Sequence, residues 1–264
     1  MPRSVVVTRY VTPLREGSSL PALVEADDGR EYVVKFRGAG HGVKALTAEL
    51  LGGLVADHLG LRVPELVYAD LPEEIARGEP HQEIRDLLGW SVGQNIGLAF
   101  ITGALAPDPT RSPPEGESWA ADLVWLDALL TNPDRTVRNP NLLVEHGRTW
   151  LIDHGSVLYI HHSWHEPDAH ARRPFERIRD HLYLPFAASL TDADERMAPR
   201  LDSAAIDRLV AEIPEDWLRD DRFSGPDAER DAYRSYIGRR MEAPRAWAAF
   251  AESVREEAQR DAVA

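Results

Sequence analysis

Strand-like and helix-like segments are segregated along this chain rather than alternating with one another. Short apolar runs that are typical of strands predominate within 1–103, whereas helical spacing predominates within 119–264. A stretch with four prolines at 104–117 lies between these two parts. Because strands and helices alternate along the chain in parallel α/β folds, this order favours an α+β fold. A length of 264 residues allows one large domain or two lobes.

The beginning of the chain predicts a small sheet. Val5–Val7 is a short β-branched run, and two further apolar runs occupy 21–26 and 31–36. Asp28 and Gly29 separate those two runs, which indicates a hairpin because glycine adopts the positive φ of the turn at little cost.

A single helix is expected within this β-rich part. Apolar side chains recur at three- and four-residue spacing over 43–61, and Gly60 is a candidate C-cap. Further strands are expected at 62–68 and 95–101. The acidic stretch 69–92 has no assignable pattern.

The second part of the chain predicts a helical lobe that carries one hairpin. Residues 119–130 have strong helical spacing, and the chain is mostly helical from Phe175 onward. Between these helices, the apolar runs 142–144 and 149–152 flank a turn, and Asp153 lies at the exit of this hairpin.

Composition excludes several classes of function. The chain has no cysteine, which excludes disulfides, thiolate metal sites and a cysteine nucleophile. Its net charge of −14 argues against nucleic acid or an anionic membrane as a direct partner. The sequence shows neither a signal peptide nor an apolar run long enough to span a membrane, so we expect a cytoplasmic protein.

Three oxygen-bearing side chains follow one another with a spacing that suits phosphoryl transfer. Asp134 and Asn139 stand five positions apart, and Asp153 follows after the hairpin. Asp134 can orient the attacking hydroxyl or accept its proton, while Asn139 and Asp153 can bind Mg²⁺ through oxygen. Asn141 is an alternative ligand to Asn139. The alternative interpretation is that the segments around Asp134 and Asn139 are ordinary Pro- and Asn-rich turns.

Lys35 is the candidate cation for the phosphates of ATP. It lies in an apolar strand, where Val33 and Lys35 share one face. A buried ammonium needs an anion, which can be phosphate or the carboxylate of Glu49 in the following helix. The alternatives are a solvated lysine of an edge strand and a glutamate on an exposed helix face.

The remaining candidates are loop residues. Backbone N–H groups and hydroxyls of Gly17, Ser18 and Ser19 can hold phosphate, although the same residues also suit an ordinary turn. A second glycine-rich loop, with Gly38, Gly40 and Gly42, is a candidate for the same role. Phe100 and Ile101, at the end of the strand predicted at 95–101, complete the predicted cofactor-binding set.

Two other chemistries fit the sequence less well than phosphoryl transfer. Six histidines between His154 and His181 invite a zinc site, but no H-E-x-x-H motif occurs, and a solvated or substrate-facing loop is favoured. A serine hydrolase would need a G-x-S-x-G motif, and the nearest segment, Asp153 to Ser156, lacks the first glycine.

These motifs together resemble the HipA-like kinases, and within them a compact branch, over about residues 15–185. The segments that carry the resemblance are Gly17-Ser18-Ser19, Val33 to Phe36, Lys44 to Leu46 with Glu49, Leu59 to Pro64, Asp134 to Asn139 and Ile152 to Gly155.

The resemblance implies a bilobal kinase-like fold, related at a distance to phosphoinositide kinases and eukaryotic protein kinases. We therefore predict a β-rich nucleotide-binding lobe at 1–103, a Pro-rich linker at 104–118 and a helical catalytic lobe at 119–264. The resemblance also implies ATP and Mg²⁺ as cofactors. In that picture Lys35 contacts ATP, Asp134 is the catalytic base, and the metal ligands are Asn139 and Asp153.

Several activities are compatible with this resemblance. The main prediction is a protein serine/threonine kinase, with Ser18 and Ser19 as candidate autophosphorylation sites. A kinase for a small-molecule or lipid hydroxyl shares the same core, and a nucleotide-binding pseudokinase that regulates a partner is a third reading. An antitoxin-type protein is a candidate partner by resemblance, although the chain is shorter than the larger HipA toxins and we expect it to lack their N-terminal domain.

Overall fold

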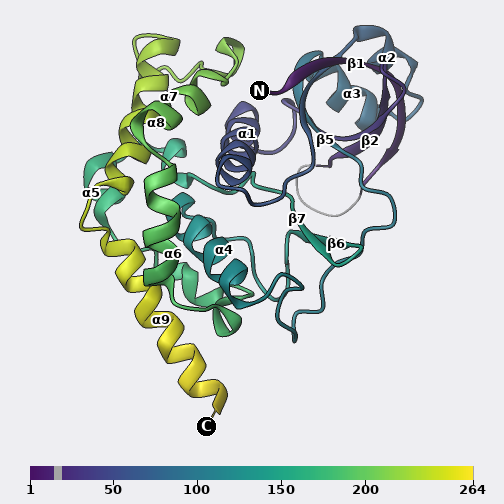
Figure 1. Cartoon of the computed structure of the whole chain (residues 1–264). Coiled ribbons are helices and arrows are strands. Elements are labelled where there is room, and N and C mark those ends of the chain that lie inside the picture. Colours follow the sequence, from purple (N-terminus) through teal and green to yellow (C-terminus); the bar gives the residue numbers. More distant parts are fainter. Residues whose placement is uncertain (15–19, 264) are drawn as a thin grey trace.

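The computed structural model describes residues 1–14 and 20–263, and its strands and helices are segregated as the sequence predicted (Figure 1). Within these residues the fold is mixed α+β, with a sheet-rich N-terminal region and a helical C-terminal region. The prolines at 104–117 lie in the irregular segment between the regions. The division of the chain at 103 and 118 into functional lobes stays a prediction.

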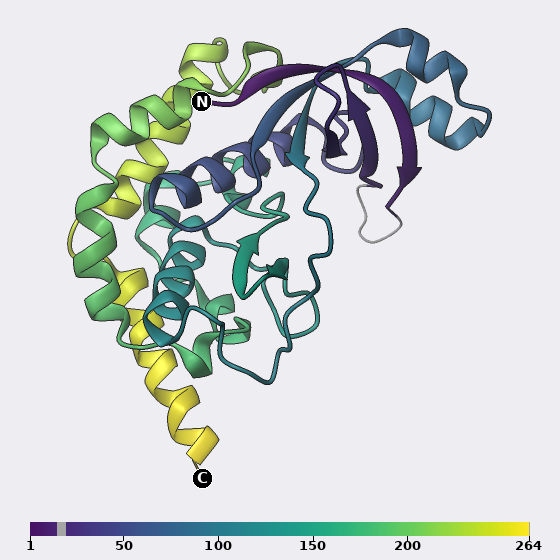
Figure 2. The same ribbon diagram turned by 45° about the vertical axis from the view of Figure 1, so that its right-hand side comes forward.

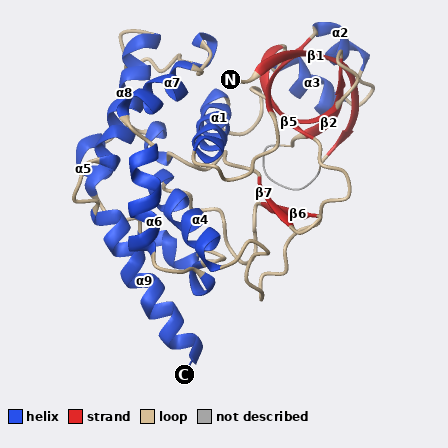
Figure 3. Ribbon diagram, in the orientation of Figure 1, coloured by secondary structure: helices blue, strands red, loops and turns tan. Residues whose placement is uncertain are grey.

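The N-terminal strands close into a barrel (Figure 3). Neighbouring strands run antiparallel except the first and fourth, which are parallel. In the order in which they pair around the barrel, the strands are β1 (Arg3–Pro13), β2 (Ala22–Ala26), β3 (Glu31–Lys35), β5 (Gly93–Ala99) and β4 (Leu66–Leu71).

Strand β1 is much longer than the run Val5–Val7 from which it was predicted. Its register shifts between Val7 and Arg9 and again between Tyr10 and Thr12. Such bulges bend a strand. The first part of β1 can therefore pair with β4 and the second part with β2. Because the bulges break the period of two, the alternation of apolar residues did not reveal the whole strand.

Strand β3 points its side chains to two different environments, as the alternation predicted. Tyr32 and Val34 are buried in the barrel core. Val33 and Lys35 face the opposite side and line a cleft outside the barrel. The strand therefore uses one face for packing and presents the other face to the site described below.

The expectation of a single helix in the N-terminal region is wrong. Besides α1 (Val43–His58), the acidic stretch forms α2 (Glu73–Gly78) and α3 (Gln82–Trp90), which lie at the outer end of the barrel (Figure 2). Ala76 and Leu88 are buried in the barrel core. Helix α2 has six residues and α3 has nine, so each shows its helical spacing over a window too short to stand out in a largely charged stretch.

Helix α1 connects the two regions. It begins after the glycine-containing loop that follows β3, and Gly60 beyond its end adopts a left-handed φ of +86°, as a C-terminal glycine does. Its buried residues, such as Leu46 and Leu50, belong to the same hydrophobic cluster as those of the C-terminal helices. The outward-facing Leu98 of β5 joins this cluster as well. The barrel interior forms a separate core.

The C-terminal region is built around α4, whose side chains are almost all buried from Ala120 to Leu130. A short hairpin follows α4 and reproduces the predicted pair of strands. The elements of this region are α4 (Glu117–Leu130), β6 (Leu142–Glu145), β7 (Arg148–Leu151), α5 (Pro167–Arg172), α6 (Leu190–Met197), α7 (Ser203–Ala211), α8 (Pro226–Met241) and α9 (Ala246–Val263).

No helix within residues 1–14 and 20–263 combines the length and the apolar character that crossing a membrane requires.

Candidate active site

A cleft of about 890 Å³ lies where the outer face of the barrel meets the C-terminal region. The barrel contributes Lys35 from β3, and the segment that follows α4 contributes Asp134 and Asn139. Asp153 and Ser156 reach the cleft from the segment after β7. Residues that are up to about half the chain apart in sequence thus share one cavity, which is large enough for a nucleotide-sized ligand.

Lys35 is held by two carboxylates at the edge of the cleft. Its Nζ donates a hydrogen bond of 2.5 Å to Oε2 of Glu49, and another to the carboxylate of Asp153. Burial lowers the pKa of Lys35, but the two carboxylates outweigh this effect, and the pKa is raised. The ammonium is therefore charged and fixed in position next to the cleft. Its burial and its pairing exclude the alternative of a solvated edge-strand lysine.

Glu49 lies behind Lys35 rather than in the cleft itself. Its side chain is fully buried in α1, which excludes the reading of an exposed helix residue. Burial alone would raise its pKa, but Lys35 and the nearby His154 lower the pKa to about 2. The carboxylate is therefore ionised at neutral pH and couples the position of Lys35 to that of α1.

This buried pair predicts an acid-dependent loss of stability. Because the pKa of Glu49 lies at about 2 in the folded protein and at 4.5 ordinarily, its contribution is complete above the ordinary pKa and disappears as the pH falls below it. Urea unfolding from about pH 5 to about pH 3 should show wild type losing about 1 kcal/mol per pH unit more than Glu49→Gln. Glu83→Gln, an exposed control on α3, should retain the wild-type slope, and an identical slope for Glu49→Gln would contradict the prediction.

Asp153 adopts a strained backbone conformation as the chain leaves β7. Its φ of +56° lies in the left-handed region, which non-glycine residues rarely occupy. Its carboxylate contacts Lys35, yet the side chain is 44% exposed and lines the cleft. Such strain persists only where the surroundings impose the geometry, as at ligand sites.

Close packing of α1 fixes the segment after Asp153. A Cβ at Gly52 would come within 2.5 Å of the Cβ of His154, whereas one at Gly238, inside α8, would meet nothing within 4 Å. We expect Gly52→Ala to destabilise the protein by about 1–3 kcal/mol and Gly238→Ala to stabilise it by up to about 1 kcal/mol. Urea unfolding of both variants tests this difference in sign. A stabilised Gly52→Ala variant would show that α1 does not approach His154 so closely.

The segment that carries Asp134 is built on a buried carboxylate, Asp127 of α4. Arg135 Nε donates to it at 2.6 Å, and Asn132 Nδ2 donates at 2.9 Å. Burial would raise the pKa of Asp127, but Arg135 and His181 lower it. Arg135 also donates to the carbonyl oxygen of Asn141 at 2.5 Å. The loop from Asn132 to Asn141 is therefore attached to α4 at both of its ends.

His181 completes the environment of Asp127. Its Nδ1 accepts a hydrogen bond of 3.1 Å from the backbone N–H of Tyr183. Its Nε2 lies 2.9 Å from Oδ2 of Asp127. Because Nδ1 is an acceptor, Nε2 carries the hydrogen and donates a hydrogen bond to the Asp127 carboxylate.

The carboxylate of Asp134 has a partner on each oxygen. Asn139 Nδ2 donates to Oδ1 at 2.9 Å, and the Ser156 hydroxyl lies 3.4 Å from Oδ2. Asn141, although buried, lines the same cleft and donates from its Nδ2 to the Asp134 carbonyl at 3.1 Å. The structure thus brings Asp134, Asn139 and Asn141 together, as their order predicted, and leaves both asparagines as candidate ligands.

The donor set at the cleft suits a hard cation such as Mg²⁺. Asp153 offers a partly exposed carboxylate, and the side chains of Asn139 and Asn141 offer amide oxygens in the same cleft. Within the described part of the chain, no three His, Asp or Glu side chains converge on one point. A cation here would take its remaining oxygens from phosphate and water, which is how Mg²⁺ is usually held.

The other predicted residues have different positions. Phe100 and Ile101 follow β5 rather than ending it, and both line the cleft, together with Gly40 of the loop after β3. Gly17, Ser18 and Ser19 lie outside the described residues. The sequence indicated none of the roles of Asp127, although a carboxylate within the apolar run of α4 was a usable signal, because a buried charge requires a partner.

The reading of the histidines as a solvated or substrate-facing loop is wrong for three of them. His154, His161 and His181 are buried. His161 Nδ1 lies 3.1 Å from the hydroxyl of Tyr233, and His181 bonds to Asp127. Long loops that cross a helical core can bury their polar rings, and spacing alone does not reveal this.

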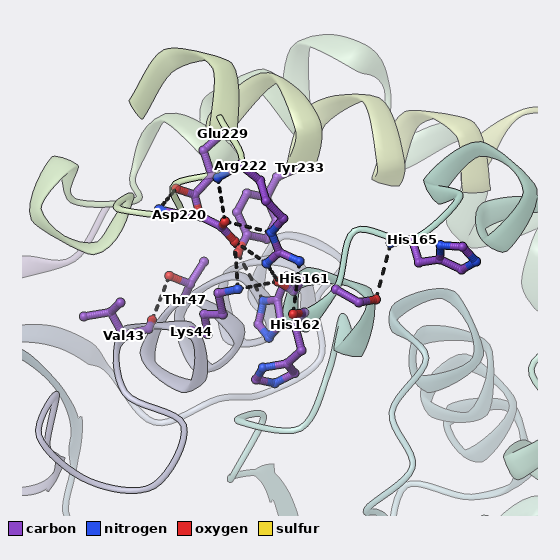
Figure 4. Close-up of polar contacts among 11 residues, drawn as sticks. Val43, Lys44, Thr47, His161, His162, His165, Asp220, Arg222, Glu229 and Tyr233 are labelled. Atoms are coloured by element: carbon purple, nitrogen blue, oxygen red, sulfur yellow. Dashed lines mark hydrogen bonds and ion pairs between the residues drawn. The ribbon is translucent and has the colours of Figure 1, made fainter. Parts of the chain in front are cut away.

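A network of ions ties the beginning of α1 to the C-terminal region (Figure 4). Lys44 Nζ donates to Asp220 at 2.8 Å and to the carbonyl of His161 at 2.7 Å. Arg222 also pairs with Asp220, whose backbone N–H bonds to Glu229. Because α1 carries Glu49, this network helps to fix the helix on which the position of Lys35 depends.

Comparisons with known proteins give the family of the chain and a similar fold. Residues 7–249 match the HipA-like kinases, and the chain belongs to that family. This confirms the resemblance and extends it beyond 15–185. Similar in fold is the structure of CtkA, a proinflammatory kinase of Helicobacter pylori, with a TM-score of 0.59 and 13% identity over 96% of this chain and 98% of that one. No curated protein matches the sequence significantly. Family and fold together support a kinase.

Proposed function

We propose that this chain is an ATP- and Mg²⁺-dependent phosphotransferase with a bilobal kinase fold, and that its acceptor is the hydroxyl of a protein serine or threonine. One observation carries the proposal. A single cleft joins Lys35 of the barrel, which is paired with Glu49, to Asp134, Asn139 and Asp153 of the C-terminal region. A cation facing oxygen ligands and a carboxylate base is the arrangement that phosphoryl transfer requires.

Each side chain has a distinct role in this proposal. Lys35 would hold the phosphates of ATP, and Asp153, whose carboxylate is partly exposed at the cleft, would be a ligand of the cation. Asn139, or the nearby Asn141, would be a second ligand of that cation. Mg²⁺ bound there supplies charge neutralisation of the phosphates. Asp134 orients the acceptor hydroxyl and accepts its proton.

The nature of the transferred group tests this proposal. Protein incubated with γ-labelled ATP and Mg²⁺ should transfer label to itself or to an acceptor, and α-labelled ATP should transfer none. Asp153→Ala should lose Mg²⁺-dependent turnover while its unfolding curve stays close to that of wild type. Asp168→Ala, which removes an exposed carboxylate paired with Arg239, is the matched control and should keep full turnover.

Two results would contradict the proposal. Full turnover by Asp153→Ala would show that Asp153 is not a metal ligand. Label transferred from the α-position would indicate nucleotidyl transfer instead. The acceptor can be sought in a native lysate, as the protein that becomes labelled with wild type and not with Asp134→Ala.

A further inference from the structure

A serine of this chain already lies where an acceptor hydroxyl would be needed. The Ser156 Oγ is 3.4 Å from Oδ2 of Asp134, while Oδ1 of the same carboxylate accepts from Asn139. Ser156 is half-buried and lines the cleft together with Lys35 and Asp153. The oxygen of Asp134 that Asn139 leaves free therefore faces a hydroxyl of its own chain.

No other hydroxyl has this position among the described residues that line the cleft. Thr136 accepts a bond from the backbone N–H of Asn139 at 3.2 Å, but it is not part of the lining. Ser163 is exposed further along the segment, and its oxygen accepts from the backbone N–H of His165. Ser156 is therefore distinguished from the other serines and threonines by its contact with Asp134 in the cleft.

The backbone around Ser156 is held on both sides. Asp153 precedes it by three positions and contacts Lys35. After it, the backbone N–H of Val157 donates to the carbonyl oxygen of His154 at 3.0 Å. The backbone N–H of Leu158 donates to the carbonyl oxygen of Leu130 at 2.8 Å. The hydroxyl is therefore presented to Asp134 by a fixed turn, which lowers the entropy cost of bringing the two groups together.

We propose that Ser156 is an internal phosphoryl acceptor, an inference that rests on the proposed function. In the reaction the Ser156 Oγ forms a bond to the γ-phosphorus of ATP while the bond from that phosphorus to the β–γ bridging oxygen breaks. The hydroxyl proton passes to Asp134, and ADP leaves with the electron pair of the broken bond. The reaction stops after one turnover per chain, because the product no longer carries the hydroxyl.

The test measures the site and the stoichiometry of labelling. Full-length protein with γ-labelled ATP and Mg²⁺ should gain one phosphoryl group per chain, mapped to Ser156 by peptide fragmentation. Ser156→Ala should lose this label, and Ser156→Thr, which keeps a hydroxyl, should retain part of it. The control Ser163→Ala should be labelled as wild type is. Asp134→Asn should be labelled about 10²–10⁴ times more slowly.

A mixture decides whether the transfer is internal. When wild type is mixed with Asp134→Asn, the variant keeps Ser156 but should stay unlabelled, and the wild-type rate constant should not depend on protein concentration. Label on Ser156 of the variant would show transfer between molecules and overturn the proposal.

The remaining outcomes separate this inference from the proposed function. ATP turnover with label on Ser18, Ser19 or any site other than Ser156 would overturn the inference and leave the kinase assignment in place. Absence of Mg²⁺-dependent ATP binding and of ADP release by wild type would overturn both.

Discussion

Asp134→Asn should slow phosphoryl transfer by about 10²–10⁴-fold, the usual contribution of a positioned general base. The amide has almost the same shape as the carboxylate, so the contacts with Asn139 and Ser156 can be rearranged without a large change in packing. Nucleotide affinity should change little, because Lys35 and Asp153 remain. The loss should therefore appear in kcat, with the dissociation constant for ATP close to that of wild type.

Single-turnover labelling and a separate measurement of nucleotide binding distinguish the two effects. Asp86→Asn, an exposed carboxylate on α3, is a control of the same chemistry and should retain wild-type values for both. An Asp134→Asn variant with an undiminished rate would show that another group accepts the proton. A variant that no longer binds ATP would show that Asp134 holds the nucleotide or its metal rather than the acceptor.

Asp127→Ala should destabilise the protein by about 3–5 kcal/mol, the cost of removing one partner from a buried ion pair. Asp127 and Arg135 are both fully buried, at 0% side-chain exposure. Without the carboxylate, the guanidinium of Arg135 and the Nε2–H of His181 would remain buried and unpaired. The loop that carries Asp134 would also lose its side-chain attachment to α4, the bonds from Asn132 Nδ2 and Arg135 Nε.

Chemical unfolding of wild type and of Asp127→Ala measures this cost. Asp122→Ala, on the same helix, removes a carboxylate that is paired with Arg196 at 2.7 Å near the surface. Such surface pairs contribute about 0–1 kcal/mol, so this control should stay close to wild type. Equal destabilisation by the two substitutions would mean that Asp127 does not anchor the loop.

Local patterns predicted the elements that have simple periodicity and short connections. The hairpin from β2 to β3, helix α1 with Gly60, helix α4 and the hairpin from β6 to β7 all lie close to their expected positions. The bulged strand β1 and the short helices α2 and α3 did not, because bulges interrupt the period of a strand and helices of six and nine residues show their spacing over only a short window.

In the candidate site, too, some features could be predicted from the sequence and others could not. The sequence alone could mark Asp134, Asn139 and Asp153 as candidates, because each proposed role needs a particular type of side chain, and the structure brings the three into one cleft. The buried residues that hold their loops in place could not be recognised from the sequence. Asp127 contacts Arg135 and His181 from other segments, so its role exists only when the chain is folded.

By itself the sequence determined the α+β class and which side chains are candidates for the chemistry, since both depend on residue type and local spacing. Only the tertiary structure decided that Lys35 meets Asp153, because their contact joins strand β3 to the exit of strand β7. It also decided which polar groups are buried and that Ser156 faces Asp134. Contacts across such distances arise from the packing of α1 between the barrel and the C-terminal helices, which no short stretch of sequence specifies.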